Sequence, residues 1–364
     1  DNAGRHAVSS NRHDIAITEE AERANRSDYT NEEWIKGIFH LYELLKSMMP
    51  EKAILANKGY EGYGRIDGAM MEHYHFDYAN RTNVECHYDN WYRFEKNNDR
   101  PLNSSGLFIF NGGGEKQDKD YHAMRFALTR CLMRDGYFLF DDTIQGHHSK
   151  MWWFDEFDNC GQGKGYLGRP TGEMQHLISA KETDAVNVFD ISALPKSESG
   201  DTYVFQPGET TKQWTIRTSV VKQPCLTIYF EFKGNADDIF SVEIPRAKLF
   251  IDQLKCEPEW QSFQFSFDSD RLTNPDCIFD FSKVDHQLMI RNLKLIAADM
   301  RLYRRNFENG IALHNGTNQS RTVSLEKPYQ KIKGIQDPQY NIGEIIERAE
   351  LSPTDGIILL NINQ

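Results

Sequence analysis

The chain has 364 residues, a net charge of −12 and an aromatic content of 12%. This length can hold two or three domains with separate cores. The charge is spread in runs of mixed sign, which disfavours nucleic acid or an anionic membrane as partner, because phosphate binding needs clustered Lys and Arg. An acidic, aromatic-rich chain better suits a neutral polar substrate.

Neither a leader nor a membrane span is expected. The sequence starts DNAGRHAVSS, without an initiator Met or an apolar signal segment, which predicts a processed or incomplete N-terminus. No apolar run reaches the roughly 18 residues of a membrane helix. Five glycosylation sequons favour a secreted or extracellular glycoprotein, and they begin at Asn25, Asn80, Asn103, Asn315 and Asn318.

The six cysteines are dispersed and form no C-x-x-C pair, so we expect no zinc site. Some disulfide pairing is expected among Cys225, Cys256 and Cys277, which lie in strand-rich sequence. No other cofactor motif is complete. Gly112-Gly113-Gly114 lacks the Lys-Ser/Thr of a phosphate loop and is interpreted as a flexible loop, and His147-His148 as a surface pair.

Residues 1–142 alternate helix and strand patterns. A helix is expected to begin at Thr30, an N-cap residue followed by first-turn acids, and further helices are expected over 88–96 and 120–133. Four apolar runs predict strands at 53–57, 66–72, 106–111 and 136–142. Continuous apolar runs are typical of strands buried on both faces of a parallel sheet.

Each of these strands ends in polar residues, where a β/α barrel places its active site. If residues 1–3 are the tip of another strand, residues 1–175 form the C-terminal half of a (β/α)₈ TIM barrel, with an active-site loop over 143–175. The remaining barrel strands would be cut off, untraced or supplied by another chain. The predicted fold class is therefore α/β plus all-β.

The pattern changes after the barrel segment. Short alternating strands separated by Gly, Pro and Asp turns predict a jelly-roll β-sandwich over 176–299, similar to a carbohydrate-binding module. A further small β domain is expected over 300–364, where Asn-Gly turns precede a terminal strand.

The strand ends supply candidates for sugar hydrolysis, which needs two carboxyls across the glycosidic bond. We choose Asp1 and Glu72 as the catalytic pair, because Glu72 directly follows an apolar strand, where partial burial favours a protonated acid. An acidic residue after a strand is more often a helix cap or a salt-bridge partner. The catalytic hypothesis is supported by repetition, because four successive strands all end in acidic or amide residues. The expected substrate-binding residues are Asn57, His73, Tyr74, His75, Asn111, Asp141, Asp142, Trp152 and Trp153.

Two of these assignments have structural alternatives. Trp152 and Trp153, with Phe154, could stack on sugar rings or could join the barrel to the next domain, and both readings stay open. Asp141 and Asp142 could instead fix the loop that follows them.

Several motifs resemble a family of barrel glycosidases, the glycosyl-hydrolase-like family 15 group. Asp1-Asn2-Ala3 resembles the end of the fourth barrel strand, and the likeness continues through Tyr166–Gly172 and Arg304–Gly310. It also covers the segments 54–57, 70–72, 121–138, 329–334 and 352–356. The resemblance implies Asp1 as nucleophile or base and Glu72 as acid. It also implies that 166–172 and 304–310 lie close together, so that about 177–299 is an inserted jelly roll.

We expect a secreted glycoside hydrolase acting on a polysaccharide or oligosaccharide, without cofactor. The alternative is a non-catalytic glycan-binding or structural glycoprotein that keeps a barrel scaffold. A polysaccharide lyase, with Tyr74 or His73 as base, is a third reading of lower weight.

Overall fold

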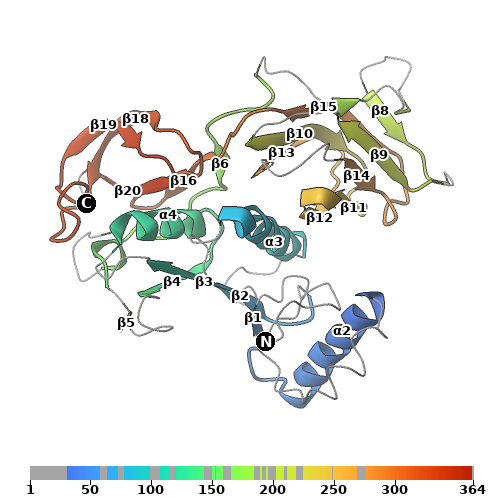
Figure 1. Cartoon of the computed structure of the whole chain (residues 1–364), viewed down its shortest axis with the longest axis horizontal. Coiled ribbons are helices and arrows are strands. Elements are labelled where there is room, and N and C mark those ends of the chain that lie inside the picture. Colours follow the sequence, from blue (N-terminus) through green and yellow to red (C-terminus); the bar gives the residue numbers. More distant parts are fainter. Residues whose placement is uncertain are drawn as a thin grey trace.

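The computed structural model of the protein describes residues 31–57, 64–72, 78–98, 107–114, 120–142, 150–151, 153–158, 165–183, 189–190, 194–195, 202–208, 211–218, 224–247, 249–268 and 276–362. Two helices form a central layer with a parallel sheet on one side and two β units on the other (Figure 1). None of the helices in these ranges is long and apolar enough to cross a membrane.

The parallel sheet contains the four predicted strands as neighbours in chain order: β1 (Leu55–Asn57), β2 (Gly68–Glu72), β3 (Leu107–Gly114) and β4 (Tyr137–Asp142). The short β5 (Lys150–Met151) adds an antiparallel edge to β4. Within the described ranges these strands form an open sheet and not a closed barrel. Gly112–Gly114, expected in a loop, are the last residues of β3 and pair with the end of β4. Glycine is uncommon inside strands, so the sequence does not indicate that β3 extends this far.

The described part of the chain has three α-helices beside this sheet: α2 (Asn31–Met48), α3 (Tyr78–Asn97) and α4 (Tyr121–Leu132). Helix α3 begins ten residues before the predicted range, because part of its polar surface is buried and its apolar pattern is therefore weak. Glu85 and Asp89 are both buried there, and Arg130 of α4 lies 3.4 Å from Glu85 and 3.3 Å from Asp89. Arg134 lies 2.8 Å from Asp89. Although burial opposes ionisation, Arg134 and Arg130 hold the pKa of Asp89 below its usual range.

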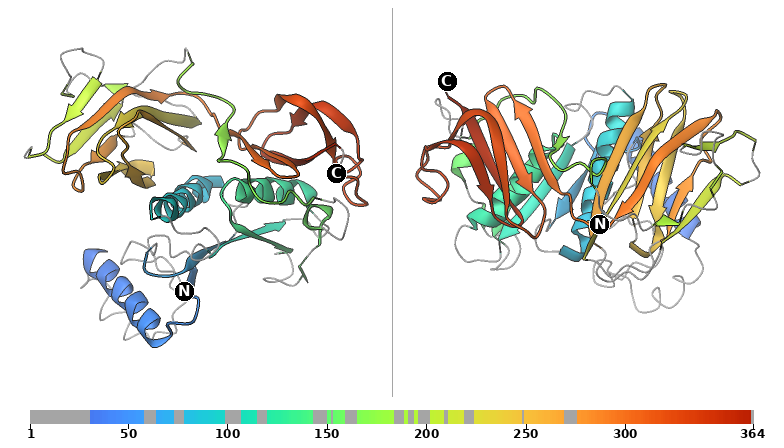
Figure 2. Two further views of the ribbon diagram at one scale, coloured as in Figure 1. Left: turned by 180° about the vertical axis from the view of Figure 1, so that it is seen from behind. Right: turned by 90° about the horizontal axis from the view of Figure 1, so that it is seen from above.

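Helix α4 is buried on all sides. Every residue from Met124 to Cys131 is buried, and Asp120 caps the helix by accepting a hydrogen bond from the amide of Ala123. The helix lies between the parallel sheet and the C-terminal sheet, as two opposite views show (Figures 1 and 2). Arg125 joins it to the C-terminal sheet through Asp355, 3.0 Å away, and through Asp337.

The inserted region forms a β-sandwich with a single core. One sheet contains β8 (Thr202–Phe205), β10 (Cys225–Lys233), β13 (Gln261–Asp268) and β15 (Leu288–Ile296). The other contains β7 (Phe189–Asp190), β9 (Gln213–Thr218), β11 (Ile239–Ile244), β12 (Leu249–Lys255) and β14 (Cys277–Asp280). Consecutive strands alternate between the sheets through most of the sandwich, as in a jelly roll. Alternate residues of each sheet, such as Phe230 and Phe279, pack between the sheets.

The C-terminal sheet contains β6 (Gln175–His176), β16 (Leu302–Phe307), β17 (Gly310–Asn315), β18 (Arg321–Lys331), β19 (Ile345–Leu351) and β20 (Asp355–Asn361). All six residues of β17 are buried, since α4 covers one face of the sheet and a second apolar cluster covers the other. Two short 3₁₀ helices, Asp155–Phe157 and Pro245–Ala247, complete the described elements.

The predicted contact between the two family-like segments is confirmed. Pro170 and Phe307 form a β-bridge, and the amide of Asn309 donates to the carbonyl of Leu167 at 2.9 Å. Immediately beyond this contact β6 pairs with β16, through Tyr303 and His176. The chain therefore leaves for the sandwich and returns from it at adjacent strands, which is the geometry of an inserted domain.

The expected cysteine pairing is wrong. Cys225, Cys256 and Cys277 are buried and form no disulfide in the described part of the structure, and the same holds for Cys86 and Cys131. Cys256 and Cys277 act as small apolar side chains in the sandwich core.

Helix α3 covers the edge of the sandwich at which strand β12 has no neighbouring strand. Strand β12 lies at the end of its sheet, so one row of its backbone groups has no neighbouring strand. Asn90 donates to the carbonyl of Phe250 at 2.7 Å and accepts from the amide of Asp252 at 2.9 Å. Arg93 donates to the carbonyl of Asp252 at 2.9 Å, and Asn97 to that of Gln253 at 3.1 Å. These side chains take the place of a further strand.

We expect Asn90→Ala to lower the free energy of unfolding by about 1–3 kcal/mol, because it removes two hydrogen bonds to β12, one from the buried amide of Asp252 and one to the carbonyl of Phe250. The matched control is Asn98→Ala, which removes an exposed side-chain amide that donates to the carbonyl of Phe94, one helix turn earlier. That control should change stability by less than about 0.5 kcal/mol. Urea unfolding followed by fluorescence measures both, and equal losses in the two variants would contradict the role of Asn90.

Candidate functional site

The backbone brings four of the predicted strand ends together in one sheet. Asn57 ends β1, Glu72 ends β2, Asn111 lies in β3, and Asp141 and Asp142 end β4. Glu72 is directly opposite Asn111 in the register of β2 and β3, and Asp141 is opposite Gly113. Asp1, His73, Tyr74, His75 and Trp152 lie outside the described residues, as do His147 and His148.

The aromatic residues after β4 divide between two roles. Phe154 is fully buried and contacts Phe140 and Phe157 edge to face. It is part of the apolar core that packs against α4. Trp153 is 62% exposed and contacts Phe157 of this cluster edge to face. Stacking on a sugar therefore stays a prediction for Trp153, whereas Phe154 has the structural role.

Burial distinguishes the two sequons near the end of β17, at Asn315 and Asn318. Asn315 is fully buried, and its amide nitrogen donates to the carbonyls of Gln319 at 2.8 Å and Ser352 at 2.7 Å. It is therefore not available for glycosylation in the folded chain, and this prediction is wrong. Asn318 is exposed, so its sequon stays a prediction. Asn80 lies in α3, and Asn25 and Asn103 lie outside the described residues.

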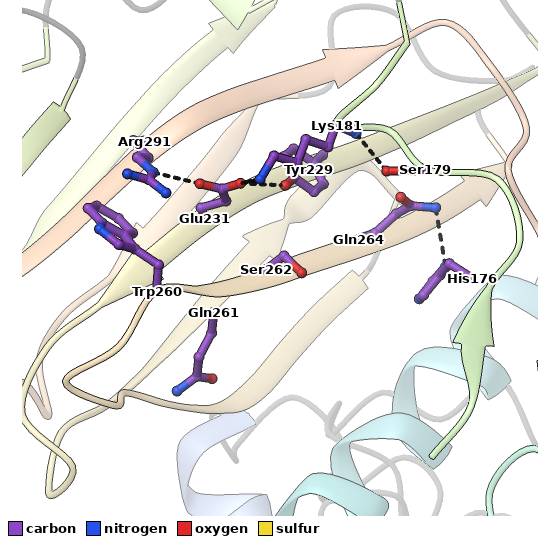
Figure 3. A pocket seen from close by; sticks show the side chains of 10 residues that line it. All are labelled: His176, Ser179, Lys181, Tyr229, Glu231, Trp260, Gln261, Ser262, Gln264 and Arg291. Carbon is purple, nitrogen blue, oxygen red and sulfur yellow. Dashed lines mark hydrogen bonds and ion pairs between the residues drawn. The ribbon is translucent and has the colours of Figure 1, made fainter. Parts of the chain in front are cut away.

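A polar pocket lies on the outer face of the sandwich sheet formed by β13, β10, β15 and β8 (Figure 3). Its volume is about 330 Å³. It is formed by strands β10, β13 and β15 and by the segment that follows β6. The lining residues are His176, Ser179, Lys181, Tyr229, Glu231, Trp260, Gln261, Ser262, Gln264 and Arg291.

The strand pattern explains how these side chains meet. On β10, Leu226, Ile228, Phe230 and Phe232 enter the core, which leaves Tyr229 and Glu231 on the outer face. Tyr229 pairs across the ladder with Gln264, and Glu231 with Ser262. The floor of the pocket is thus a grid of polar side chains on a rigid sheet.

A β-bulge brings Arg291 to the face of the sheet that carries the pocket. The register of β10 and β15 shifts between Tyr229 and Glu231, and Asn292 on β15 has a positive φ of 52°. Glu231 therefore pairs with Arg291, while Tyr229 pairs with Lys294, only three residues later. Arg291 and Lys294 both lie on the outer face of the sheet. In a regular strand two residues three positions apart would lie on opposite faces.

Glu231 is the buried charge of the pocket, with only 3% of the residue exposed. Its carboxylate accepts from Arg291 Nε at 2.6 Å and from the Tyr229 hydroxyl at 3.0 Å, and Lys181 Nζ lies 2.8 Å away. Burial alone would raise the pKa of Glu231, but the hydrogen bonds from Lys181, Arg291 and Tyr229 lower it to about 2. Tyr229 is held as a donor, and burial with this bond raises its pKa. A tyrosine in this state is a poor base.

Gln264 fixes one wall of the pocket. Its amide oxygen accepts from the Ala180 amide at 2.8 Å, and its nitrogen donates to the Ile178 carbonyl at 2.9 Å. The same nitrogen lies 3.2 Å from His176 Nδ1. These contacts hold the segment 176–181 against the sheet and so position Lys181.

Trp260 forms the opposite wall. It precedes β13 directly and is half-buried, and the Arg291 guanidinium carbon lies 4.0 Å from its ring centroid. Lys233 Nζ lies 5.1 Å from the same ring. An indole beside a polar floor provides both an apolar surface and hydrogen-bonding groups, the combination typical of a site for a polar ligand with an apolar face.

The sequence interpretation missed this pocket. The alternation of polar with apolar residues along β10 and β13 is visible in the sequence, and it identified the strands. It does not reveal that Arg291 joins the same face through a bulge. Nor does it show that residues 176–181 return across the sheet.

Comparison with known proteins identifies the family. The model of hypothetical glycosyl hydrolase family 15 matches residues 1–189, about half of the chain. The chain belongs to this family. The match includes α2, α3, α4, the parallel sheet and β6, and it ends where the sandwich begins. No curated protein matches the chain.

Among solved structures, several carbohydrate-binding modules are similar to this chain. A CBM4 module is 14% identical with a TM-score of 0.22, covering 28% of this chain and 74% of that chain. The PbXyn10C module is 11% identical with a TM-score of 0.21, covering 48% and 96%. The family 11 module of the cellulosomal cellulase Lic26A-Cel5E of Clostridium thermocellum is 14% identical with a TM-score of 0.19, covering 32% and 84%. At these scores the likenesses add no argument to the geometry above.

Proposed function

We propose that the chain is a carbohydrate-active protein of its family, in which the sandwich pocket binds a saccharide and the strand ends of the α/β part carry glycoside hydrolysis. The observation that supports binding most directly is the Trp260 ring beside the polar floor of Tyr229, Glu231 and Ser262. A sugar ring has an apolar C–H face and a rim of hydroxyls, so it complements both parts of this pocket.

The proposal for catalysis depends on the family and on the strand ends. We propose that β1–β4 belong to the second half of a (β/α)₈ barrel, since the four strands are parallel neighbours in chain order and helices α3 and α4 connect β2 to β3 and β3 to β4, as such a barrel requires. Glu72, opposite Asn111, is the proposed acid, and Asp1 is the proposed nucleophile or base. Secretion as a glycoprotein remains part of this proposal, with Asn318 as an exposed sequon.

A second candidate is a glycan-binding protein without hydrolytic activity. It is supported by one observation: the pocket lies on β10, β13 and β15 of the sandwich, and none of its lining residues comes from the strands β1–β4 that carry the candidate acids. Binding and hydrolysis therefore need separate tests.

For binding, we expect Trp260→Ala to weaken saccharide affinity by about 30-fold or more, the usual effect of removing a buried aromatic anchor. Affinity electrophoresis of the whole chain on gels with soluble polysaccharides measures this change. Tyr137→Ala is the matched control, because Tyr137 is an exposed aromatic residue at the start of β4, outside the pocket and the candidate site residues, and it should migrate like the parent chain. Unchanged affinity in Trp260→Ala would reject the pocket as the binding site.

For catalysis, we expect Glu72→Gln to reduce the release of reducing sugar by about 10²–10⁴-fold, because the amide cannot donate the proton to the leaving oxygen. Glu347→Gln, on the exposed face of β19, is the control and should keep full activity. Full activity in Glu72→Gln would exclude Glu72 as the acid. Saccharide binding without any hydrolysis by the parent chain would favour the second candidate.

A further inference from the structure

The permanent charges of the sandwich pocket do not balance. Lys181 and Arg291 are both bound to the single carboxylate of Glu231. Glu231 stays ionised at neutral pH, because its three hydrogen bonds lower its pKa to about 2. The pocket lining therefore carries two cations for one anion, an excess of one positive charge held on a rigid sheet.

Arg291 has donors to spare. It binds Glu231 through Nε alone, at 2.6 Å, and its ring contact with Trp260 uses the face of the guanidinium. Its two terminal nitrogens have no acceptor among the contacts of the described residues. A planar guanidinium in this position can bind an oxyanion with both of them. The Lys181 side chain is 57% exposed, so its ammonium can also reach a ligand.

The surroundings strengthen the positive charge. Lys294 is fixed on the same face by the carbonyls of Ala180 and Lys181, at 3.5 and 3.2 Å, and Lys233 lies beside the Trp260 ring. The acids next to the pocket in sequence, Glu182 and Glu259, are exposed and do not line it. This local excess occurs in a chain whose net charge is −12.

We propose that the saccharide bound by this pocket is anionic, with a carboxylate or sulfate group seated between Arg291 and Lys181 and the sugar ring against Trp260. This inference rests on the proposed binding function and names its ligand class. It differs from the neutral substrate expected from overall charge, because the local cations and not the total charge decide what a pocket attracts. The negative charge of the rest of the chain opposes non-specific binding of polyanions, so a preference for them would arise at this site.

The test uses polymer pairs that differ mainly in charge. Polygalacturonate is compared with its methyl ester, and a sulfated galactan with agarose, by affinity electrophoresis of the whole chain. We expect at least one charged polymer to bind about tenfold or more tighter than its neutral partner. Arg291→Gln and Lys181→Gln should each reduce that preference, and Arg291→Lys should retain part of it. Lys283→Gln removes an exposed charge after β14, away from the pocket lining, and should change nothing.

The outcomes separate this inference from the proposed function. If neutral and charged partners bind equally, and Trp260→Ala still abolishes binding, the pocket binds saccharides but the anionic class is wrong. If the preference for charged polymers persists in Arg291→Gln and Lys181→Gln, while both variants melt like the parent, the anionic group does not bind between Arg291 and Lys181. If no polymer responds to Trp260→Ala, the pocket function itself fails, and this inference fails with it. Preference for one charged pair distinguishes carboxylate from sulfate.

Discussion

The hydrogen bonds from helix α3 to the edge of the sandwich are the interaction on which the rest of the structure depends. Strand β12 ends its sheet, and an open edge of this kind exposes unpaired backbone groups. Asn90, Arg93 and Asn97 satisfy the carbonyls of Phe250, Asp252 and Gln253, and Asn90 also accepts from the amide of Asp252. The inserted sandwich is therefore packed onto the α/β part through a specific interface, beyond its two connecting segments. The pocket keeps a fixed position relative to the parallel sheet.

The same helix joins this interface to the centre of the molecule. On its other side Glu85 and Asp89 bind Arg130 of α4, and Asp89 also binds Arg134, just after the end of α4. Helix α4 in turn is anchored to the C-terminal sheet, where Arg125 meets Asp355. Burying these charges is tolerated because each is paired, and loss of one partner would leave the other unsolvated. Hydrogen bonds between the sandwich and α3, and ion pairs from α3 to α4 and from α4 to the C-terminal sheet, thus connect the three parts of the molecule.

Much of this fold could be predicted from the sequence, because continuous apolar runs and alternating runs report burial directly. The four parallel strands, the sandwich and the contact between Leu167 and Asn309 follow from such patterns or from family motifs. The pocket could not be predicted, because Arg291 reaches it through a bulge at Asn292 and Lys181 through a loop held by Gln264. Asn315 shows the converse limit. Its sequon is intact, but burial makes it a structural amide.

The central claim is that the outer face of the sandwich is a saccharide site fixed to a glycosyl hydrolase family fold. A crystal structure of the chain, soaked with an oligosaccharide of the polymer that binds it most tightly, tests this claim most directly. We expect the sugar ring to lie against Trp260, with its polar groups bonded to Arg291, Lys181 and Ser262. A saccharide seated elsewhere on the chain, with this pocket empty, would contradict the claim.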